Sequence, residues 1–169
     1  MTVTLQKSNT RDLGFVFSLA QNGVRHGHFD SSITREKTGF RSYLNAIISN
    51  ERDLQGKPAQ LLVAMENNER VGTSLVAAAA GTPDGGVELV MIAVKSEHRG
   101  KGYGATMLDM LMNHYLPRCS MYVRCFPASE KLRQMLLRRD FSEVGELGGA
   151  IILRHEAIRF ADQPVVYSH

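Results

Sequence analysis

The sequence contains no long apolar stretch: no window approaches the roughly eighteen consecutive apolar residues that a membrane-spanning helix needs. Its first residues, MTVTLQKSNTRDLG, lack the charged and then apolar layout of a secretory signal. Internal repeats, low-complexity tracts and linkers are also missing from the 169 residues. We therefore expect a single domain over residues 1–169 that neither crosses a membrane nor is exported.

Cysteine is scarce, and no metal-ligand cluster can be recognised. The two cysteines, Cys119 and Cys125, fall on one predicted strand, where six residues of extended chain separate them by about 20 Å. That distance excludes a disulfide within the chain, and two free thiols favour a reducing compartment such as the cytoplasm. His26 and His28 have no further His or Cys group to complete a metal site, so we expect no bound metal.

The excess of one charge sign is small. The formal net charge is +3, and the Lys and Arg residues are scattered along the chain. A charge of this size suits an anionic ligand but argues against nucleic acid as the partner. The hydrophobic fraction of 43% and the charged fraction of 22% are typical of a soluble globular protein.

Apolar periodicity and turn residues predict an alternation of helices and strands. The run VELVMIAV is apolar except for Glu88, which is typical of a central strand covered on both faces. A helix then leads to the next strand, and a strand–helix–strand unit of this kind implies parallel pairing. The predicted elements are a strand at 3–7, helices at 10–23 and 40–50, a hairpin of 60–66 with 71–80, a strand at 87–94, a helix ending at 117, a strand at 120–126, a helix near 128–139 and a closing hairpin of 141–146 with 149–155.

The stretch SEHRGKGYGATMLDML, residues 96–111, places three glycines where the central strand hands over to a helix, and a helix start can bind phosphate. Two phosphate motifs are excluded. Gly100, Gly102 and Ala105 fit the loose dinucleotide pattern, but they lie beyond the tight turn, and no acidic residue ends the next strand. A P-loop would need glycine where Lys95 stands, and serine or threonine where Gly102 stands.

A third pattern fits. The segment from Val94 to Ala105 resembles the acyl-CoA signature R-x-x-G-x-G/A of the GNAT superfamily of N-acetyltransferases, with Arg99, Gly102 and Gly104 at its fixed positions. The order of elements is similar over nearly the whole chain, and ELVMIAVKSEHRGKGYG looks closest to the histone-acetyltransferase type. The resemblance implies an α/β (α+β) fold. It has a mixed, largely antiparallel sheet, a central parallel pair of strands splayed at one end, and about four flanking helices.

The resemblance also implies acetyl-CoA as co-substrate. Amides from Arg99 to Ala105 can converge on its pyrophosphate, whereas the pantetheine arm would pair with the splayed edge of the central strand. There the Ile92 amide should face the thioester carbonyl. The alternative is a glycine-rich helix entry with solvated basic residues. The expected cofactor-binding residues are Ile92, Ala93, Val94, Arg99, Gly100, Lys101, Gly102, Tyr103, Gly104, Ala105 and Ser129.

The acceptor implied by the resemblance is an amine, which is mostly protonated at neutral pH and must lose a proton before attack. Glu88 matches the position of the general base in the histone-acetyltransferase type. Strict alternation places it on one face with Val90, Ile92 and Val94, although a β-bulge would change that. The alternative is a glutamate at the solvated start of a strand.

The chain departs from the family pattern on the last helix. Aligning the family's Gly-Phe ending on Asp140-Phe141 puts Ser129 at the usual Asn position and Leu136 at the usual Tyr position. The tyrosine expected to protonate the departing thiolate is therefore missing. A thiolate is a tolerable leaving group, and Tyr122, Cys125 or a water can also serve, with Cys125 more typical of a core residue.

These observations favour direct acetyl transfer from acetyl-CoA to a primary amine of a small molecule or a protein, without a covalent enzyme intermediate. The alternative is a non-catalytic acyl-CoA-binding sensor or regulatory module of the same fold, which the missing tyrosine permits. The sequence does not identify the acceptor. The tail at 156–169 carries enough apolar residues to dock on a second copy of the chain, which would form a homodimer.

Overall fold

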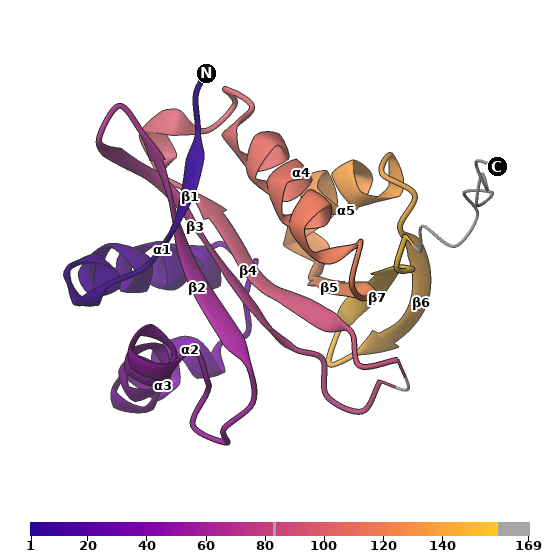
Figure 1. Ribbon diagram of the computed structural model, residues 1–169, viewed down its shortest axis with the longest axis horizontal. Coiled ribbons are helices and arrows are strands. Elements are labelled where there is room, and N and C mark those ends of the chain that lie inside the picture. The colour runs from indigo at the N-terminus through magenta and orange to yellow at the C-terminus, as the bar shows by residue number, and fades with distance from the viewer. Residues whose placement is uncertain (83, 159–169) are drawn as a thin grey trace, which may run out of the picture.

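The structure is a computed structural model that describes residues 1–82 and 84–158. Within them, seven strands form one mixed sheet in the order β1-β2-β3-β4-β5-β7-β6 (Figure 1). The strands are β1 (Thr4–Lys7), β2 (Ala59–Glu66), β3 (Glu69–Ala78), β4 (Val87–Val94), β5 (Met121–Cys125), β6 (Ser142–Leu147) and β7 (Ala150–His155).

Five α-helices occur in the same residues, one more than the approximate number expected. The additional one is the single turn α2, which is too short to show apolar periodicity in the sequence. The helices are α1 (Leu13–Arg25), α2 (Ser32–Arg35), α3 (Lys37–Asn50), α4 (Tyr103–Tyr115) and α5 (Glu130–Leu137). Most of the tail predicted at 156–169, and with it the docking role, lies outside the described residues.

The central strands confirm the predicted topology. All neighbouring strands run antiparallel except β4 and β5, which are parallel. These two pair only from Val87 with Met121 to Leu89 with Val123. Beyond that point β4 continues unpaired on this side to Val94, so a gap opens between the two strands. In parallel sheets, such a gap at the carboxyl ends of the strands is the usual place for a ligand.

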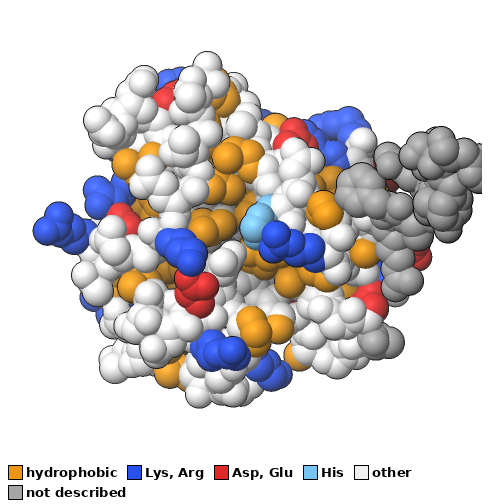
Figure 2. Space-filling model, viewed as in Figure 1, with side chains coloured by type: hydrophobic (Ala, Val, Ile, Leu, Met, Phe, Trp, Pro, Cys, Tyr) orange, Lys and Arg blue, Asp and Glu red, His pale blue; other side chains and the backbone are white. Residues whose placement is uncertain are grey.

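Basic side chains are dispersed on the one face of the molecule that Figure 2 draws. On the face drawn in Figure 2, Lys and Arg side chains are separated by neutral and acidic ones, and apolar side chains lie in the centre. Proteins that bind nucleic acid present a continuous basic stripe or patch instead. This face therefore agrees with the small net charge of +3.

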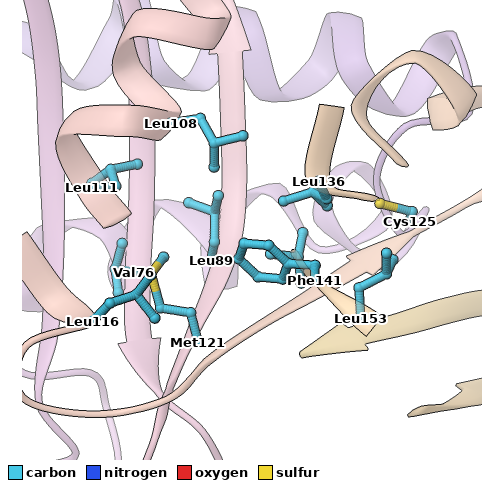
Figure 3. Packing of buried hydrophobic residues seen from close by; sticks show 11 residues of the cluster. Val76, Leu89, Leu108, Leu111, Leu116, Met121, Cys125, Leu136, Phe141 and Leu153 are labelled. Atoms are coloured by element: carbon cyan, nitrogen blue, oxygen red, sulfur yellow. The ribbon is translucent and has the colours of Figure 1, made fainter. Parts of the chain in front are cut away.

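The helices cover the two faces of the sheet (Figure 1). One face is packed by α1 and α3, through Val16, Ala20, Leu44 and Ile47 against strands β2 to β4. The other face is packed by α4 and α5, and Figure 3 shows Leu108, Leu111 and Leu136 gathered over Leu89 and Phe141. Burying large aliphatic side chains on both faces explains why β4 is an almost continuous apolar run.

A β-bulge in β4 decides which face each side chain occupies. The register of β3 against β4 shifts at Val90, which has no partner in β3. Leu89 packs toward α4 and α5, whereas Met91 packs toward α1 and α3. Glu88 therefore lies on the α1–α3 face with Met91, while Ile92 packs toward α4. The strict alternation that grouped Glu88 with Ile92 is wrong because the bulge reverses the facing of every later residue.

Gly23 has a packing role in α1. The sequence predicts a helix stop at Asn22-Gly23, but α1 continues to Arg25. Gly23 is buried, and a Cβ there would overlap the ring of Phe29, which lies directly against it. The glycine thus allows a close approach between the helix and the loop that follows it.

We expect Gly23→Ala to lower the free energy of unfolding by about 1–3 kcal/mol, because the Phe29 ring must move to admit the methyl group. The matched control is Gly39→Ala in α3, where the nearest atom would be 3.8 Å from the added Cβ. That variant should be neutral or more stable by up to about 1 kcal/mol, as alanine favours the helix. Urea denaturation of both variants provides the measurement, and equal stabilities would contradict the packing role.

Candidate active site

The signature loop ends in a helix start whose amides are available to a ligand. After β4 the chain makes one 3-10 turn and an extended residue, Arg99. Gly100 and Gly102 then adopt positive φ angles of 74° and 87°, a region that favours glycine. Gly102 is the N-cap of α4 and provides no side-chain cap. The amides of residues 103–105, in the first turn of α4, have no carbonyl partner within the helix.

The side chains around this loop hold it in place. The Tyr103 hydroxyl donates a hydrogen bond to the Glu66 carboxylate in β2, which ties the start of α4 to the β2–β3 hairpin. The Arg99 Nε donates to the Val94 carbonyl oxygen at 3.0 Å. Tyr103 is thus placed to offer a ligand its amide rather than its ring. The Lys101 side chain is exposed and donates no hydrogen bond to any of the described residues.

The open edge of β4 faces the gap. The Lys95 amide donates to the Val71 carbonyl of β3 at 2.8 Å, so the backbone groups of Lys95 point toward β3. Because the pointing direction alternates along an antiparallel strand, Ala93 also faces β3, whereas Ile92 and Val94 face the side from which β5 has separated. The Ile92 amide is therefore directed into the gap, as an oxyanion donor would need to be.

The opposite wall of the gap is formed by the start of α5 and by the loop between α1 and α2. Ser129 is buried, and its Oγ is hydrogen-bonded to His28 Nδ1 at 2.8 Å. Burial lowers the pKa of His28, and the positive charges of Arg99 and His26 lower it further. His28 thus connects the α1–α2 loop to the start of α5, and it lies within electrostatic range of Arg99. The sequence carries no signal for this contact, because 101 positions separate His28 from Ser129.

We expect the stability of the wild type to fall relative to that of His28→Asn as the pH drops below 6.5. The pKa of His28 is lowered from 6.5 in the folded protein, so the unfolded chain takes up the proton first. The stabilising effect is therefore present above that pH and is lost as the pH falls through the lowered folded value. Urea titrations at about pH 7.5 and about pH 5 measure the difference. A difference that does not vary with pH would contradict the expectation.

Glu88 lies on the α1–α3 face, in an ion pair with the next strand. Its Oε1 accepts a hydrogen bond from Arg124 Nε of β5 at 2.5 Å. The side chain of Glu88 is 20% exposed and that of Arg124 is 44% exposed, so solvent and small molecules can reach the pair. The second carboxylate oxygen of Glu88 makes no hydrogen bond within the described residues. Glu88 is therefore one member of an ion pair with Arg124, a partner that the sequence analysis did not identify.

A pocket of about 380 Å³ opens next to this pair, between α2–α3 and the central strands. Hydrogen bonds from Ser32 lower the pKa of the Asp30 carboxyl, which keeps it ionised. Burial, and then the charges of Asp53 and Glu88, raise the pKa of the Tyr43 hydroxyl, which keeps it protonated. The residues that line the pocket are Asp30, Ser32, Ile33, Phe40, Tyr43, Leu75, Val90, Met91 and Arg124.

The candidate proton donors for a thiolate do not face the gap. Leu136, at the usual tyrosine position, is fully buried beside Cys125 (Figure 3). Burial raises the pKa of the Cys125 thiol to about 11, as expected of a core residue. The Tyr122 hydroxyl accepts from Arg154 Nε at 3.1 Å, at the end where β4 and β5 are still paired. Cys119 lies just before β5, so the prediction that both cysteines fall on this strand is wrong for Cys119; both thiols are free.

Comparison with known families agrees with this geometry. The sequence model of the acetyltransferase (GNAT) family matches residues 29–141, which include the splayed strands and the signature loop. The chain belongs to the GNAT acetyltransferase family. The resemblance and the fold class inferred from the sequence are thereby confirmed. No curated protein matches the chain.

Several solved GNAT structures share the fold. The PaiA N-acetyltransferase of Thermoplasma acidophilum, in complex with coenzyme A, superposes with a TM-score of 0.70 at 16% identity, covering 92% of this chain and 99% of the other. The ribosomal-protein-S18-alanine N-acetyltransferase of Escherichia coli gives 0.63 at 15% identity, covering 92% and 94%. An aminoglycoside acetyltransferase in complex with coenzyme A gives 0.64 at 15%, covering 92% and 95%. Their acceptors range from a ribosomal protein to aminoglycosides, so this GNAT fold alone does not indicate an acceptor.

The described residues contain neither a helix fit to span a membrane nor a cluster of metal ligands. None of the α-helices in residues 1–82 and 84–158 combines the length and apolar character required to span a bilayer. In the same residues, His, Cys, Asp and Glu side chains form no group of three or more that could hold a metal ion.

Proposed function

We propose that this GNAT protein transfers an acetyl group from acetyl-CoA directly to a primary amine of a small molecule or a protein. The observation that carries the proposal is the uncapped start of α4 beside the open edge of β4. Amides of residues 99–105, with Arg99 and Lys101, would bind the pyrophosphate. The pantetheine arm would pair with Ile92 and Val94 in the gap and pass Ser129.

The Ile92 amide would stabilise the negative charge on the thioester oxygen during attack, a contribution of about 3 kcal/mol for a single donor of this kind. Glu88 would take the proton of the attacking ammonium through its unpaired oxygen, directly or through one water. The amine then attacks the carbonyl carbon, the carbon–sulfur bond breaks, and coenzyme A leaves as a thiolate. Because Leu136, Cys125 and Tyr122 provide no donor there, water would protonate it.

The second candidate is a non-catalytic acyl-CoA sensor of the same fold. The observation that favours it is the buried Leu136, which leaves the family's tyrosine position without a hydroxyl. Cofactor binding would be the same in both cases. The two functions differ only in turnover.

The test measures thiol release from acetyl-CoA with a chromogenic disulfide over a panel of primary amines, alongside calorimetry with coenzyme A. The enzyme is expected to bind coenzyme A and to release thiol with at least one class of amine. Binding without release on any amine, unchanged by Glu88→Gln, would favour the sensor. Absence of coenzyme A binding would refute both.

We also propose that the reaction takes place in the cytoplasm, where acetyl-CoA and reducing conditions are found together. The two free cysteines, Cys119 and Cys125, support this location. The dispersed basic side chains in Figure 2 give no support to nucleic acid as the partner. Strong, salt-dependent DNA binding would contradict that view.

A further inference from the structure

The pocket beside Glu88 combines an apolar wall with a guanidinium that has hydrogen-bonding capacity to spare. We propose that the acceptor is an α-amino acid with an apolar or aromatic side chain. Its carboxylate would bind Arg124, and its α-amine would be acetylated. The inference rests on the proposed acetyl transfer and specifies the substrate class of that site.

Arg124 is oriented to receive a carboxylate. Its Nε is used by Glu88 Oε1 at 2.5 Å, which fixes the plane of the guanidinium. Its two terminal nitrogens make no hydrogen bond within the described residues, although the side chain lines the pocket. A planar pair of N–H donors matches the two oxygens of a carboxylate, and arginine is the residue that offers this geometry. Glu88 thus holds Arg124 in place, and the free edge is left for a ligand.

The remaining wall is suited to a side chain of moderate size. Phe40 and Tyr43 stack with their ring centroids 6.2 Å apart, and Ile33 and Met91 complete an apolar surface. A pocket of about 380 Å³ accommodates a small molecule and not a large one. Leucine-like or phenylalanine-like side chains would bury apolar area against these residues.

The position of the pocket brings the α-amine toward the reactive carbonyl. Val90 and Met91 line the pocket and directly precede Ile92, whose amide faces the gap. In an α-amino acid the amine is two bonds from the carboxylate carbon. A carboxylate bound by Arg124 therefore keeps the amine at the same end of the pocket as the gap, with the apolar side chain directed toward α3.

The balance of charges disfavours a polyamine or another polycation. Asp30 lies within electrostatic reach of both Arg35 and Arg124, and Glu88 is paired with Arg124. The charged residues that line the pocket are one carboxylate, Asp30, and one guanidinium, Arg124, so the lining has no excess negative charge to collect several ammonium groups. A zwitterion fits this balance, because Arg124 would bind its carboxylate and Glu88 would accept the proton of its ammonium.

The experiment compares pairs of acceptors that differ only in the carboxylate, with a polyamine as a third kind of acceptor. Thiol release from acetyl-CoA is measured with L-phenylalanine against 2-phenylethylamine, with L-leucine against 3-methylbutylamine, and with spermidine. We expect each amino acid to exceed its decarboxylated partner by about 100-fold in kcat/KM, because removing the carboxylate leaves the two terminal nitrogens of Arg124 without their ligand. Spermidine should be the poorest acceptor.

Arg124→Gln provides the second arm. The variant is expected to reduce the preference for the amino acid from about 100-fold to less than about 10-fold, mainly by raising KM. Its dissociation constant for coenzyme A should stay within about twofold of the wild type, which shows that the cofactor site is intact. The matched control is Arg139→Gln, which breaks an ion pair with Asp109 on the opposite face of the sheet and should leave the preference unchanged.

The outcomes separate this inference from the proposed function. Equal or better turnover of the decarboxylated amines overturns the inference while acetyl transfer stands. If no amine releases thiol although coenzyme A binds, acetyl transfer fails, and calorimetry of L-phenylalanine with the coenzyme A complex then tests the pocket alone. Binding that is lost in Arg124→Gln would support the amino-acid site. Absence of such binding would overturn it.

Discussion

Replacing Gly104 with valine is expected to weaken the binding of coenzyme A by at least about 100-fold without unfolding the protein. Gly104 is the second residue of α4, and its amide is one of the three in the first turn. A Cβ at this position would be 3.7 Å from Val94 Cγ2, an ordinary contact, so the fold itself does not require glycine. A branched side chain would instead occupy the space through which a diphosphate approaches the amides.

The matched control for this variant is Gly14→Val. Gly14 is also the second residue of a helix, α1, and a Cβ there would have nothing within 4 Å. Both variants place the same side chain at the same helical position, so they should have similar melting temperatures. Calorimetry should show normal coenzyme A binding for Gly14→Val only. Normal binding by Gly104→Val would mean that the diphosphate binds elsewhere.

The signature loop could be predicted from sequence because its residues are contiguous. Arg99, Gly102 and Gly104 specify a bend and a helix start within six positions, and the structure places positive φ angles at two glycines of this segment. The parallel pairing of the central strands was equally accessible, since a strand–helix–strand unit leaves few alternatives. Local chemistry and chain order were sufficient for both features.

The sequence could not predict on which face of the sheet Glu88 lies relative to Ile92. A β-bulge adds one residue to a strand, and the apolar pattern of the sequence does not reveal where it occurs. Val90 is as apolar as its neighbours, and only its missing partner in β3 identifies it. The predicted helix end at Gly23 is wrong for a related reason. A glycine in a helical pattern indicates either the end of the helix or a position where another segment packs closely against it. The choice here depends on Phe29, whose ring position follows from the tertiary fold.

The residues that complete the site come from distant parts of the chain. Asp30 reaches the pocket from the loop between α1 and α2 and Tyr43 reaches it from α3, and nothing in their spacing relates them to Glu88. Arg124 did carry a signal. It is the one charged residue of β5, just as Glu88 is the one charged residue of β4, and adjacent parallel strands bring such residues together. When each of two adjacent apolar strands contains a single charged residue of opposite sign, the two residues are therefore candidates for an ion pair.

Glu88→Gln is expected to lower kcat by about 100-fold or more at neutral pH, because the acceptor ammonium then has no base to take its proton. The dissociation constant of coenzyme A should not change, since Glu88 is remote from the signature loop along β4. The deficit should shrink toward about pH 9, where a larger fraction of the amine is already neutral. The matched control is Glu143→Gln, which breaks an ion pair between Glu143 of β6 and Arg133 of α5 and should leave kcat unaltered.

The same variant separates the two roles of Glu88. A carboxylate that only orients Arg124 would, when replaced by glutamine, raise KM for the acceptor and leave the pH dependence of kcat as in the wild type. A general base would lose kcat at neutral pH and recover it in alkali. Because Arg124→Gln removes the carboxylate-binding edge but keeps Glu88, its kcat at saturating acceptor should stay close to that of the wild type. If Glu88→Gln kept full kcat across the pH range, Glu88 would not be the general base, and water would accept the proton of the acceptor ammonium.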